Sequence, residues 1–227
     1  MQNARLERLK SVLDIRQPDL TLFLEKVHKP HNLSAIMRTC DAVGVHQLHA
    51  VSADERFTRG HRSSSGTGKW LEVALHPDVA TGIDVLRSEG FRVFAAHQSR
   101  DAVDYRNVDY TQPTAVLLGA ELEGVSEAAA RQADGHISIP MLGLGSSLNV
   151  SVAAGIILYE AQRQRQAAGL YAAPRLNATH YEKTLFEWLY PRVADACRQR
   201  GLCYPSLDRD GHIVGNSDNL KKSLSPC

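Results

Sequence analysis

The chain has 227 residues, a length that fits one ordinary domain with additional terminal elements. Its hydrophobic content of 43% and charged content of 22% are typical of a globular protein. No run of about 18 apolar residues indicates a membrane span, and the start of the chain lacks the apolar core of a signal peptide. We therefore expect a cytoplasmic protein that has no membrane partner.

The formal net charge is only +1, but the charge is unevenly distributed along the chain. Residues 160–200 carry seven basic and four acidic side chains, whereas residues 100–135 carry three basic and seven acidic ones. A nearly neutral chain can still bind RNA if its positive charge gathers on one face. Ordinary solvated surface charge is the alternative interpretation.

The four cysteines and ten histidines do not form a pattern typical of a metal site. No two cysteines have the CxxC spacing, and the pairs His28/His31 and His46/His49 have no cysteine or carboxylate that completes a zinc-type ligand set. We therefore predict free thiols and no bound metal.

The apolar pattern predicts helices and strands that alternate along the chain. The predicted elements are a helix over 3–14, a strand over 20–27, a helix over 33–43, a strand over 45–51, mostly loop over 52–70, a helix over 79–89, a strand over 91–97, a polar connection over 98–112, a strand over 114–121, a helix over 126–133, a strand over 136–141, a helix over 147–167 and a helix over 180–200 kinked at Pro191, followed by a loosely ordered tail from 203. Strands separated by helices indicate an α/β fold with a mainly parallel sheet, and apolar strands without alternation suit a sheet covered on both faces.

Three of these strands end in segments suited to binding a ligand. They end near His97, near Gly119 and in the segment 139–148, which holds Gly143 and Gly145. Ligands of parallel sheets bind beyond the carboxyl ends of the strands, and glycine there lets the backbone approach a ligand closely. Simple turn chemistry is the alternative for any one loop. No G-x-G-x-x-G motif follows the first strand, so a Rossmann site is not indicated.

Several polar residues lie at the starts of helices or after strands. Asn32 is expected to cap the helix over 33–43, which places Arg38 on its exposed face. Ser147 is expected to cap the long helix, and Asn149 in its apolar first turn needs hydrogen-bond partners. Glu121 follows a buried strand, where an exposed carboxylate would be unremarkable.

Two arginines, Arg163 and Arg165, lie near the C-terminal end of the long helix. Positive charge is favoured there by the helix dipole, which is one explanation for them. Contact with RNA phosphate, shared with Arg8 in the first helix, is the other.

Three segments resemble the motifs of the SpoU (TrmH) family of RNA 2′-O-ribose methyltransferases. They are 26–44 (KVHKPHNLSAIMRTCDAVG), 119–124 (GAELEG) and 139–160 (IPMLGLGSSLNVSVAAGIILYE), and the similarity extends over about 20–170. The first helix and the long C-terminal region further resemble the members that act on tRNA. The resemblance implies a SPOUT α/β knot with a trefoil-knotted chain, and a homodimer with its active site at the interface. It divides the chain into an N-terminal helix (1–18), a catalytic domain (19–168) and a C-terminal helical extension (169–227).

The same resemblance implies S-adenosyl-L-methionine as methyl donor and the 2′-hydroxyl of guanosine 18 in the tRNA D-loop as acceptor. Because the acceptor is a 2′-hydroxyl, the substrate is RNA and not DNA. The positions that match the cofactor-binding ones are His97, Gly119, Ile139, Met141 and Leu148. Arg8, His31, Arg163 and Arg165 are the candidate RNA-binding residues.

Arg38 matches the catalytic arginine of the family, to which the resemblance assigns the role of general base. A free guanidinium has a pKa above about 12 and rarely loses its proton, so Arg38 could instead orient the hydroxyl or stabilise the developing oxyanion. Asn32, Glu121, Ser147 and Asn149 would support the site.

Two alternatives to this function remain open at the level of the sequence. The first is the same chemistry on ribosomal RNA or on the wobble nucleotide of tRNA. The second is a non-catalytic RNA-binding protein with the same fold.

Overall fold

The computed structural model describes residues 2–51, 67–120 and 123–214. The chain forms two compact units, of which one is Gln17–Ala172 and the other combines Met1–Arg16 with Ala173–Cys227. No helix within the described ranges is long and apolar enough to cross a bilayer.

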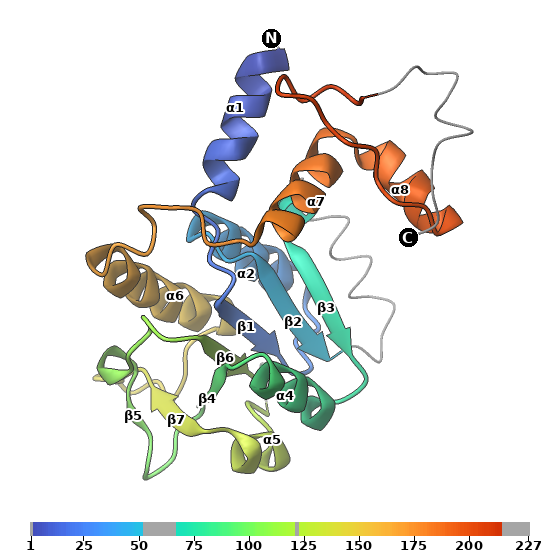
Figure 1. The fold of residues 1–227 in the computed structure, drawn as a ribbon. Helices are drawn as coiled ribbons and strands as arrows, with labels where there is room; N and C mark the ends of the chain where they lie inside the picture. The colour runs from blue at the N-terminus through green and yellow to red at the C-terminus, as the bar shows by residue number, and fades with distance from the viewer. Residues whose placement is uncertain (1, 52–66, 121–122, 215–227) are drawn as a thin grey trace. The chain divides into compact units, whose positions relative to one another are not determined.

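The larger unit contains a seven-stranded parallel sheet (Figure 1). Its strands are β1 (Leu20–Leu24), β2 (Gln47–Val51), β3 (Glu72–His76), β4 (Arg92–Ala96), β5 (Val103–Asp104), β6 (Thr114–Leu118) and β7 (Gly135–Ser138), and its helical elements are α2 (Pro30–Ala42), the 3-10 turn η1 (Thr67–Trp70), α4 (Val79–Ser88), the 3-10 turn η2 (Tyr105–Asn107), α5 (Glu127–Gln132) and α6 (Val150–Ala167). The strand order is β3-β2-β1-β6-β4-β7-β5, and every pair is parallel. The predicted α/β class with a parallel sheet is confirmed.

Two strands were missed by the sequence pattern, and both lie at an edge of the sheet. β3 is mostly half-buried, so its residues lack the apolar run that identifies a central strand. β5 has only two residues, which is too short for any periodicity.

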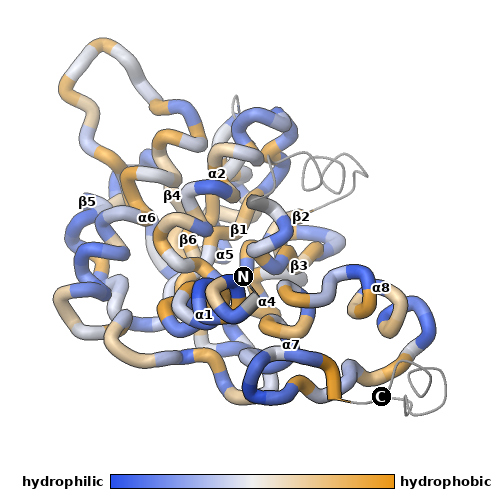
Figure 2. The backbone as a smooth tube through the Cα atoms, turned by 90° about the horizontal axis from the view of Figure 1, so that it is seen from above, coloured by the Kyte–Doolittle hydropathy of each residue, from blue (hydrophilic) through white to orange (hydrophobic). Residues whose placement is uncertain are grey.

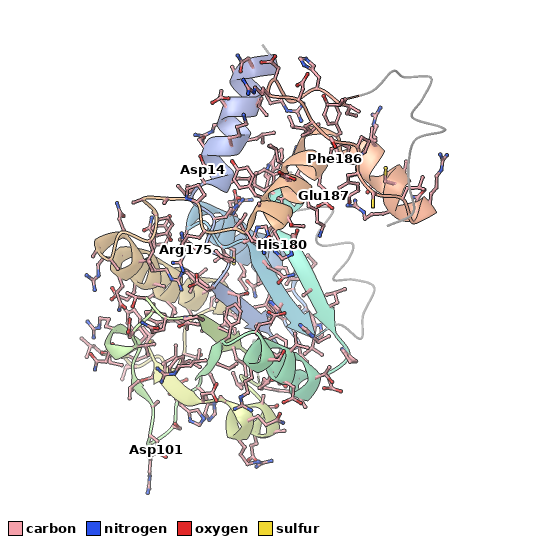
Figure 3. All side chains as sticks on the ribbon, viewed as in Figure 1. Asp14, Asp101, Arg175, His180, Phe186 and Glu187 are labelled. Atoms are coloured by element: carbon pink, nitrogen blue, oxygen red, sulfur yellow. The ribbon has the colours of Figure 1, made fainter. Side chains whose placement is uncertain are left out.

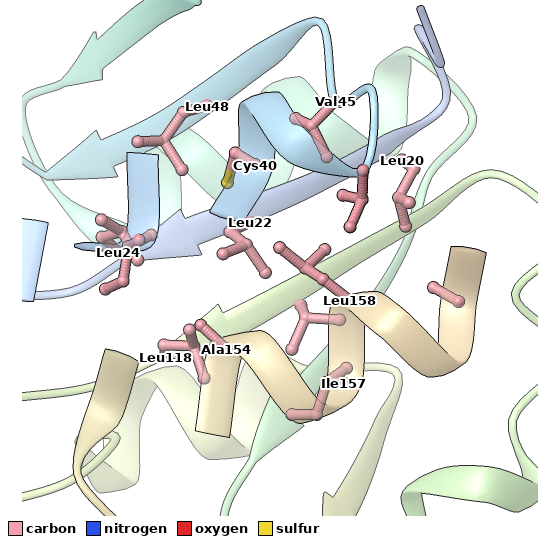
Figure 4. Close-up of a cluster of buried hydrophobic side chains, with 14 of the residues drawn as sticks. Leu20, Leu22, Leu24, Cys40, Val45, Leu48, Leu118, Ala154, Ile157 and Leu158 are labelled. Atoms are coloured by element: carbon pink, nitrogen blue, oxygen red, sulfur yellow. The ribbon is translucent and has the colours of Figure 1, made fainter. Parts of the chain in front are cut away.

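Both faces of the sheet are covered by helices, as its apolar strands indicated. On β1, Leu20, Leu22 and Leu24 face a core shared with α2 and α6 (Figure 4). Phe23 points to the opposite face and a second core, which includes side chains of α4 and α5. Because side chains alternate along a strand, one apolar segment supplies both cores.

The starts of the two helices that carry the polar motif residues differ from the prediction. α2 begins at Pro30, whose fixed φ and missing N–H suit the first helical position. Asn32 is therefore a fully buried residue inside the first turn and not the cap. The cap of α6 is Asn149, whose side-chain oxygen accepts a hydrogen bond from the N–H of Ser151 at 2.8 Å. The prediction that Ser147 caps this helix was wrong.

The smaller unit contains α1 (Gln2–Leu13), α7 (Ala178–Leu189) and α8 (Pro191–Arg200). Hydrophilic and hydrophobic stretches alternate along α7 and α8 (Figure 2), as amphipathic helices require. The Tyr181 hydroxyl donates to Asp14 at 2.8 Å, and the Tyr204 hydroxyl donates to Glu187 at 2.6 Å. Figure 3 labels the acceptors Asp14 and Glu187. The ring of Tyr204 also stacks on Phe186.

Two expectations for this C-terminal region were wrong. The helix predicted over 180–200 is two helices, because Pro191 has no N–H to continue α7 and instead starts α8. Of the tail predicted from residue 203, the structure describes the part through residue 214, which contains a bridge between Leu207 and Ile213, and residues 215–227 lie outside the described part. Cys40 and Cys197 are free thiols, whereas Cys203 forms a disulfide that the prediction did not include.

A pair of buried histidines joins β2 and β3. The His49 Nδ1 and His76 Nε2 atoms are 2.9 Å apart, and the rings stack at 5.2 Å. Burial, and secondarily the neighbouring His76, lower the pKa of His49 to about 4. Burial also lowers the pKa of His76. Both imidazoles are therefore neutral in the folded protein at neutral pH.

This pair predicts a loss of stability in mild acid. Because the pKa of His49 is lower in the folded state than in the unfolded state, protonation favours unfolding. The contribution of neutral His49 to the free energy of unfolding is complete above about pH 6.5. It falls by up to about 3 kcal/mol as the pH drops toward about 4. Urea unfolding between pH 8 and pH 4 measures this loss. The His49→Phe variant should show a flatter pH dependence, whereas the exposed-histidine control His180→Asn should follow the wild type. If the unfolding free energies of all three proteins changed equally with pH, the acid sensitivity would not come from His49.

Candidate active site

A cavity of about 410 Å³ lies at the carboxyl ends of three neighbouring strands, β4, β6 and β7. All five residues predicted to bind a cofactor line it, namely His97, Gly119, Ile139, Met141 and Leu148. These positions come from three connections far apart in the sequence, and they meet because parallel strands end at the same edge of the sheet. Their predicted role in cofactor binding remains a prediction.

Gly119 has a specific steric reason to be glycine. A Cβ atom at this position would lie 2.0 Å from the backbone carbon and oxygen of Gly124 and 2.2 Å from the nitrogen of Val125. Gly124 itself has φ of +69°, a conformation that side chains disfavour. The connection after β6 therefore folds back on itself so closely that only glycine fits at its first position.

Two polar contacts at the cavity wall were not predicted from the sequence. The Gln98 side chain donates to the carbonyl of Ser146 at 2.9 Å, which joins the connection after β4 to the one after β7. The His97 ring packs edge-on against His136 at 5.6 Å, and His136 in turn contacts the hydroxyl of Ser99 at 2.8 Å. Their position directly after a strand end was the only signal in the sequence that could have identified Gln98 and Ser99.

The structure brings together the two asparagines of the first and third motifs. The Asn149 amide nitrogen donates to the Asn32 side-chain oxygen at 3.1 Å, and Asn149 also accepts from the hydroxyl of Ser151 at 2.7 Å. Asn149 follows Leu148 and precedes Val150, which both line the cavity. This hydrogen bond therefore connects the rim of the cavity to the first turn of α2.

Arg38 lies on the exposed side of the same helix. It is six residues after Asn32, which corresponds to roughly 9 Å along the helix axis. Its side chain is not part of the cavity wall, and within the described residues it forms no hydrogen bond or ion pair. His31 is exposed at the start of α2, and Ser147 lines the cavity as an exposed residue. Glu121 lies outside the described residues.

The three predicted RNA-binding arginines have very different surroundings. Arg8 is exposed on α1. Arg163 is exposed on α6 and paired with Glu160 at 2.7 Å. Arg165 is fully buried, and its guanidinium donates to Asp19 at 2.6 Å and to Gln17 at 3.0 Å. The prediction that Arg165 contacts RNA is therefore wrong, because no phosphate can reach it.

Arg165 instead joins three segments of the larger unit. Besides Asp19 and Gln17, it binds the carbonyls of Tyr110 and Gln112. We expect Arg165→Met to lose about 3–5 kcal/mol of unfolding free energy, because it leaves the Asp19 carboxylate without its partner. Arg163→Met is the matched control on the same helix and should change stability by less than about 1 kcal/mol. Chemical denaturation measures both, and equal losses would contradict this role.

One group of possible metal ligands occurs among the described residues. Carboxylate and imidazole atoms of Asp208, Asp210 and His212 lie within 4.8 Å of one another, and all three residues are exposed. Asp208 accepts hydrogen bonds from the N–H groups of Asp210 and His212, so the cluster is the product of a tight turn.

Comparison with known proteins gives a consistent family. Residues 19–159 match the SpoU rRNA Methylase family, and residues 163–216 match the C-terminal part described as SpoU, rRNA methylase, C-terminal. The tRNA (guanosine(18)-2′-O)-methyltransferase of Thermus thermophilus is 56% identical over 82% of this chain and 96% of its own length. The enzyme of that name from Escherichia coli K12 is 44% identical over 96% of both chains.

Solved structures agree with the sequence relatives. The Aquifex aeolicus TrmH/SpoU tRNA modifying enzyme superposes with a TM-score of 0.76 at 42% identity, covering 85% of this chain and 98% of that one. An AdoMet-bound rRNA methyltransferase from Sinorhizobium meliloti superposes with a TM-score of 0.59 at 31% identity, covering 67% of this chain and 59% of that one. The threading of the knot stays a prediction. Because the family models, the relatives and the fold all agree, the chain belongs to the SpoU methylase family.

Proposed function

We propose that this protein transfers the methyl group of S-adenosyl-L-methionine to the 2′-hydroxyl of guanosine 18 in the D-loop of tRNA. One observation gives this proposal its main support. One cavity gathers the ends of three strands, two of which lead into motif segments, and the Asn149–Asn32 hydrogen bond connects its rim to the helix that carries Arg38. The relatives named for this activity cover nearly the whole chain, which supports tRNA as the substrate.

The cavity fits a cofactor of this kind. Its volume of about 410 Å³ lies within the range of small-molecule sites. Leu118, Ile139 and Leu148 supply apolar walls suited to a purine ring, while Gly119 and Gly124 bring backbone close to the cavity. S-adenosyl-L-methionine supplies a methyl group made electrophilic by its sulfonium, so the chemistry needs no metal ion.

Arg38 is the side chain that we propose acts on the ribose. Its guanidinium has free donors on the exposed face of α2, so it can donate hydrogen bonds to the 2′-oxygen and stabilise the negative charge that develops there. A guanidinium rarely deprotonates, and we therefore favour this role over that of general base. Asn32 and Asn149 hold the first turn of α2 against the cavity rim, which fixes the position of Arg38.

We further propose that the active protein is a homodimer. Leu142 and Leu144, in the connection after β7, are fully exposed, and Val152 and Tyr159 on α6 are about half exposed. Large apolar side chains gathered near a site are typical of an interface. A second copy covering this face would place the active site at the interface between the two subunits. Residues 19–168 would then be the catalytic domain, with 1–18 and 169–227 as the tRNA-binding extensions.

Methyl transfer from labelled S-adenosyl-L-methionine to an unmodified tRNA transcript tests the proposal. Label on guanosine 18, and none on a transcript with a 2′-deoxy guanosine there, is the expected result. Label on ribosomal RNA or on the wobble nucleotide instead would show the same methyl transfer to a different RNA substrate. Cofactor binding with no transfer to any RNA would favour a non-catalytic RNA-binding protein.

The exposed arginines should contribute to tRNA affinity through phosphate contacts. We expect the Arg8→Gln and Arg163→Gln variants to bind tRNA more weakly, each with a salt dependence reduced by about one unit in the slope of log K against log salt. Fluorescence titration at several salt concentrations measures the slope. Arg131→Gln is the control, because Arg131 is an exposed arginine in a surface pair with Glu127. Unchanged slopes in the first two variants would place the RNA contacts elsewhere.

A further inference from the structure

Glu25 is a buried carboxylate directly after β1. It is 4% exposed, and it precedes the short segment that leads to the start of α2 at Pro30. Transfer of a carboxylate out of water is costly unless hydrogen bonds compensate for it. The hydrogen bonds of this side chain therefore indicate why a carboxylate is buried at this position.

Glu25 binds both ends of the connection between β6 and α5. Its backbone N–H donates to the carbonyl of Leu118 at 2.8 Å, where β6 ends. Its carboxylate accepts a hydrogen bond from the N–H of Ser126 at 2.9 Å, immediately before α5. Gly119 and Val125, which lie between these two points, line the cofactor cavity. One residue thus closes the ends of the loop that forms this wall of the cavity.

The carboxylate is not needed to start α5. The Ser126 hydroxyl already caps that helix by accepting from the N–H of Ala129 at 3.2 Å. A neutral side chain of similar size at position 25 would avoid the desolvation cost, and buried charged groups are weak contributors to stability. Charge-assisted hydrogen bonds are, however, strong and geometrically specific. The arrangement is suited to fixing the positions of Leu118 and Ser126 relative to β1.

The segment that begins at Glu25 also reaches the opposite side of the cavity. Asn32, in the first turn of α2, is bound by Asn149 at the end of the connection after β7. Contacts at residues 25 and 32 therefore tie the approach to α2 to two of the three connections that form the cavity, those after β6 and β7. The helix that carries Arg38 is thereby joined to these two connections.

We infer that Glu25 is a positioning residue for cofactor binding, which fixes the two ends of the connection between β6 and α5, at Leu118 and Ser126, beside the cavity. The inference rests on the proposed function, because it takes the cavity to be the site of S-adenosyl-L-methionine. Glu25 acts through the loop and does not line the cavity itself. Its removal should therefore affect the affinity for the cofactor more than the affinity for tRNA.

The test measures the dissociation constants of S-adenosyl-L-methionine and of tRNA for the full chain by calorimetry. Glu25→Ala, and Glu25→Asp with its shorter reach, should weaken cofactor binding roughly tenfold or more, with tRNA binding unchanged. Glu25→Gln keeps an oxygen that accepts from Ser126 and should restore most of the affinity. Thr21→Val is the matched control, because Thr21 is buried on the same strand and donates to the carbonyl of Gln47 at 2.6 Å, within the sheet.

Each result distinguishes this inference from the proposed function. Wild-type affinity in both Glu25→Ala and Glu25→Asp would overturn the inference while leaving the function in place. Equal weakening in Thr21→Val would also overturn it, because the effect would then reflect general destabilisation of the sheet. A wild-type protein that does not bind S-adenosyl-L-methionine would overturn both. If Glu25→Ala does not fold, the contrast between Glu25→Asp and Glu25→Gln decides the matter.

Discussion

Replacing Arg38 with alanine is expected to reduce methyl transfer to tRNA by at least about 10²-fold while leaving the affinity for S-adenosyl-L-methionine unchanged. Arg38 lies outside the cavity wall, so its loss removes no contact with the cofactor. It would remove the group that stabilises the 2′-oxygen as that atom attacks the methyl carbon. Single-turnover transfer of label, together with calorimetric titration of the cofactor, separates the two effects.

Two further variants make the result specific to Arg38. Arg131→Ala removes an exposed arginine on α5 and should leave the rate unchanged. Arg38→Lys keeps a positive charge without the planar guanidinium, so partial recovery would support charge stabilisation and no recovery would support bidentate orientation of the substrate. Turnover near the wild-type rate in Arg38→Ala would contradict the assigned role.

Replacing Gly119 with alanine is expected to weaken cofactor binding by roughly 10–100-fold, through an effect on the backbone alone. The added Cβ would lie 2.0 Å from the backbone of Gly124, and backbone cannot move aside as a flexible side chain can. The connection after β6 must therefore open, which changes the wall of the cavity. Calorimetric titration with S-adenosyl-L-methionine measures the loss.

Gly155→Ala is the matched control for this substitution. Gly155 lies inside α6, and a Cβ there would meet nothing within 4 Å. We expect unchanged cofactor affinity and a gain in stability of about 0.5–1 kcal/mol, since alanine is the better helix former. Equal affinities of the Gly119→Ala and wild-type proteins would show that this close approach is not needed for binding.

The sequence predicted the fold class because the central strands are continuous apolar runs. The segment Thr114–Leu118 is buried at every position, and only a sheet covered on both faces buries such a run. The edge strand β3 could not be predicted in the same way, because partial exposure leaves its residues mixed in character. Pro191 was recognised as a disturbance of a helix, but the end of α7 and the start of α8 depend on how the surrounding chain packs.

The place of the cavity was predicted from the sequence for a physical reason. Parallel strands end at a common edge, so glycines and polar residues after successive strands gather there whatever the remaining contacts are. All five predicted positions line one cavity as a result. The sequence did not indicate the contacts that hold the cavity walls, such as Gln98 with Ser146, because they join residues 48 positions apart.

By itself, the sequence determined the α/β class, the edge of the sheet where the cavity lies and the residues that resemble a methyltransferase family. Tertiary structure decided which polar residues are structural and which are available to a substrate. Arg163 and Arg165 are two positions apart in one basic run, yet one is exposed and the other is enclosed by Asp19 and backbone carbonyls. A helix turns by about 100° per residue, so residues two apart point in nearly opposite directions. Only the packing of that helix decides which of them faces the solvent.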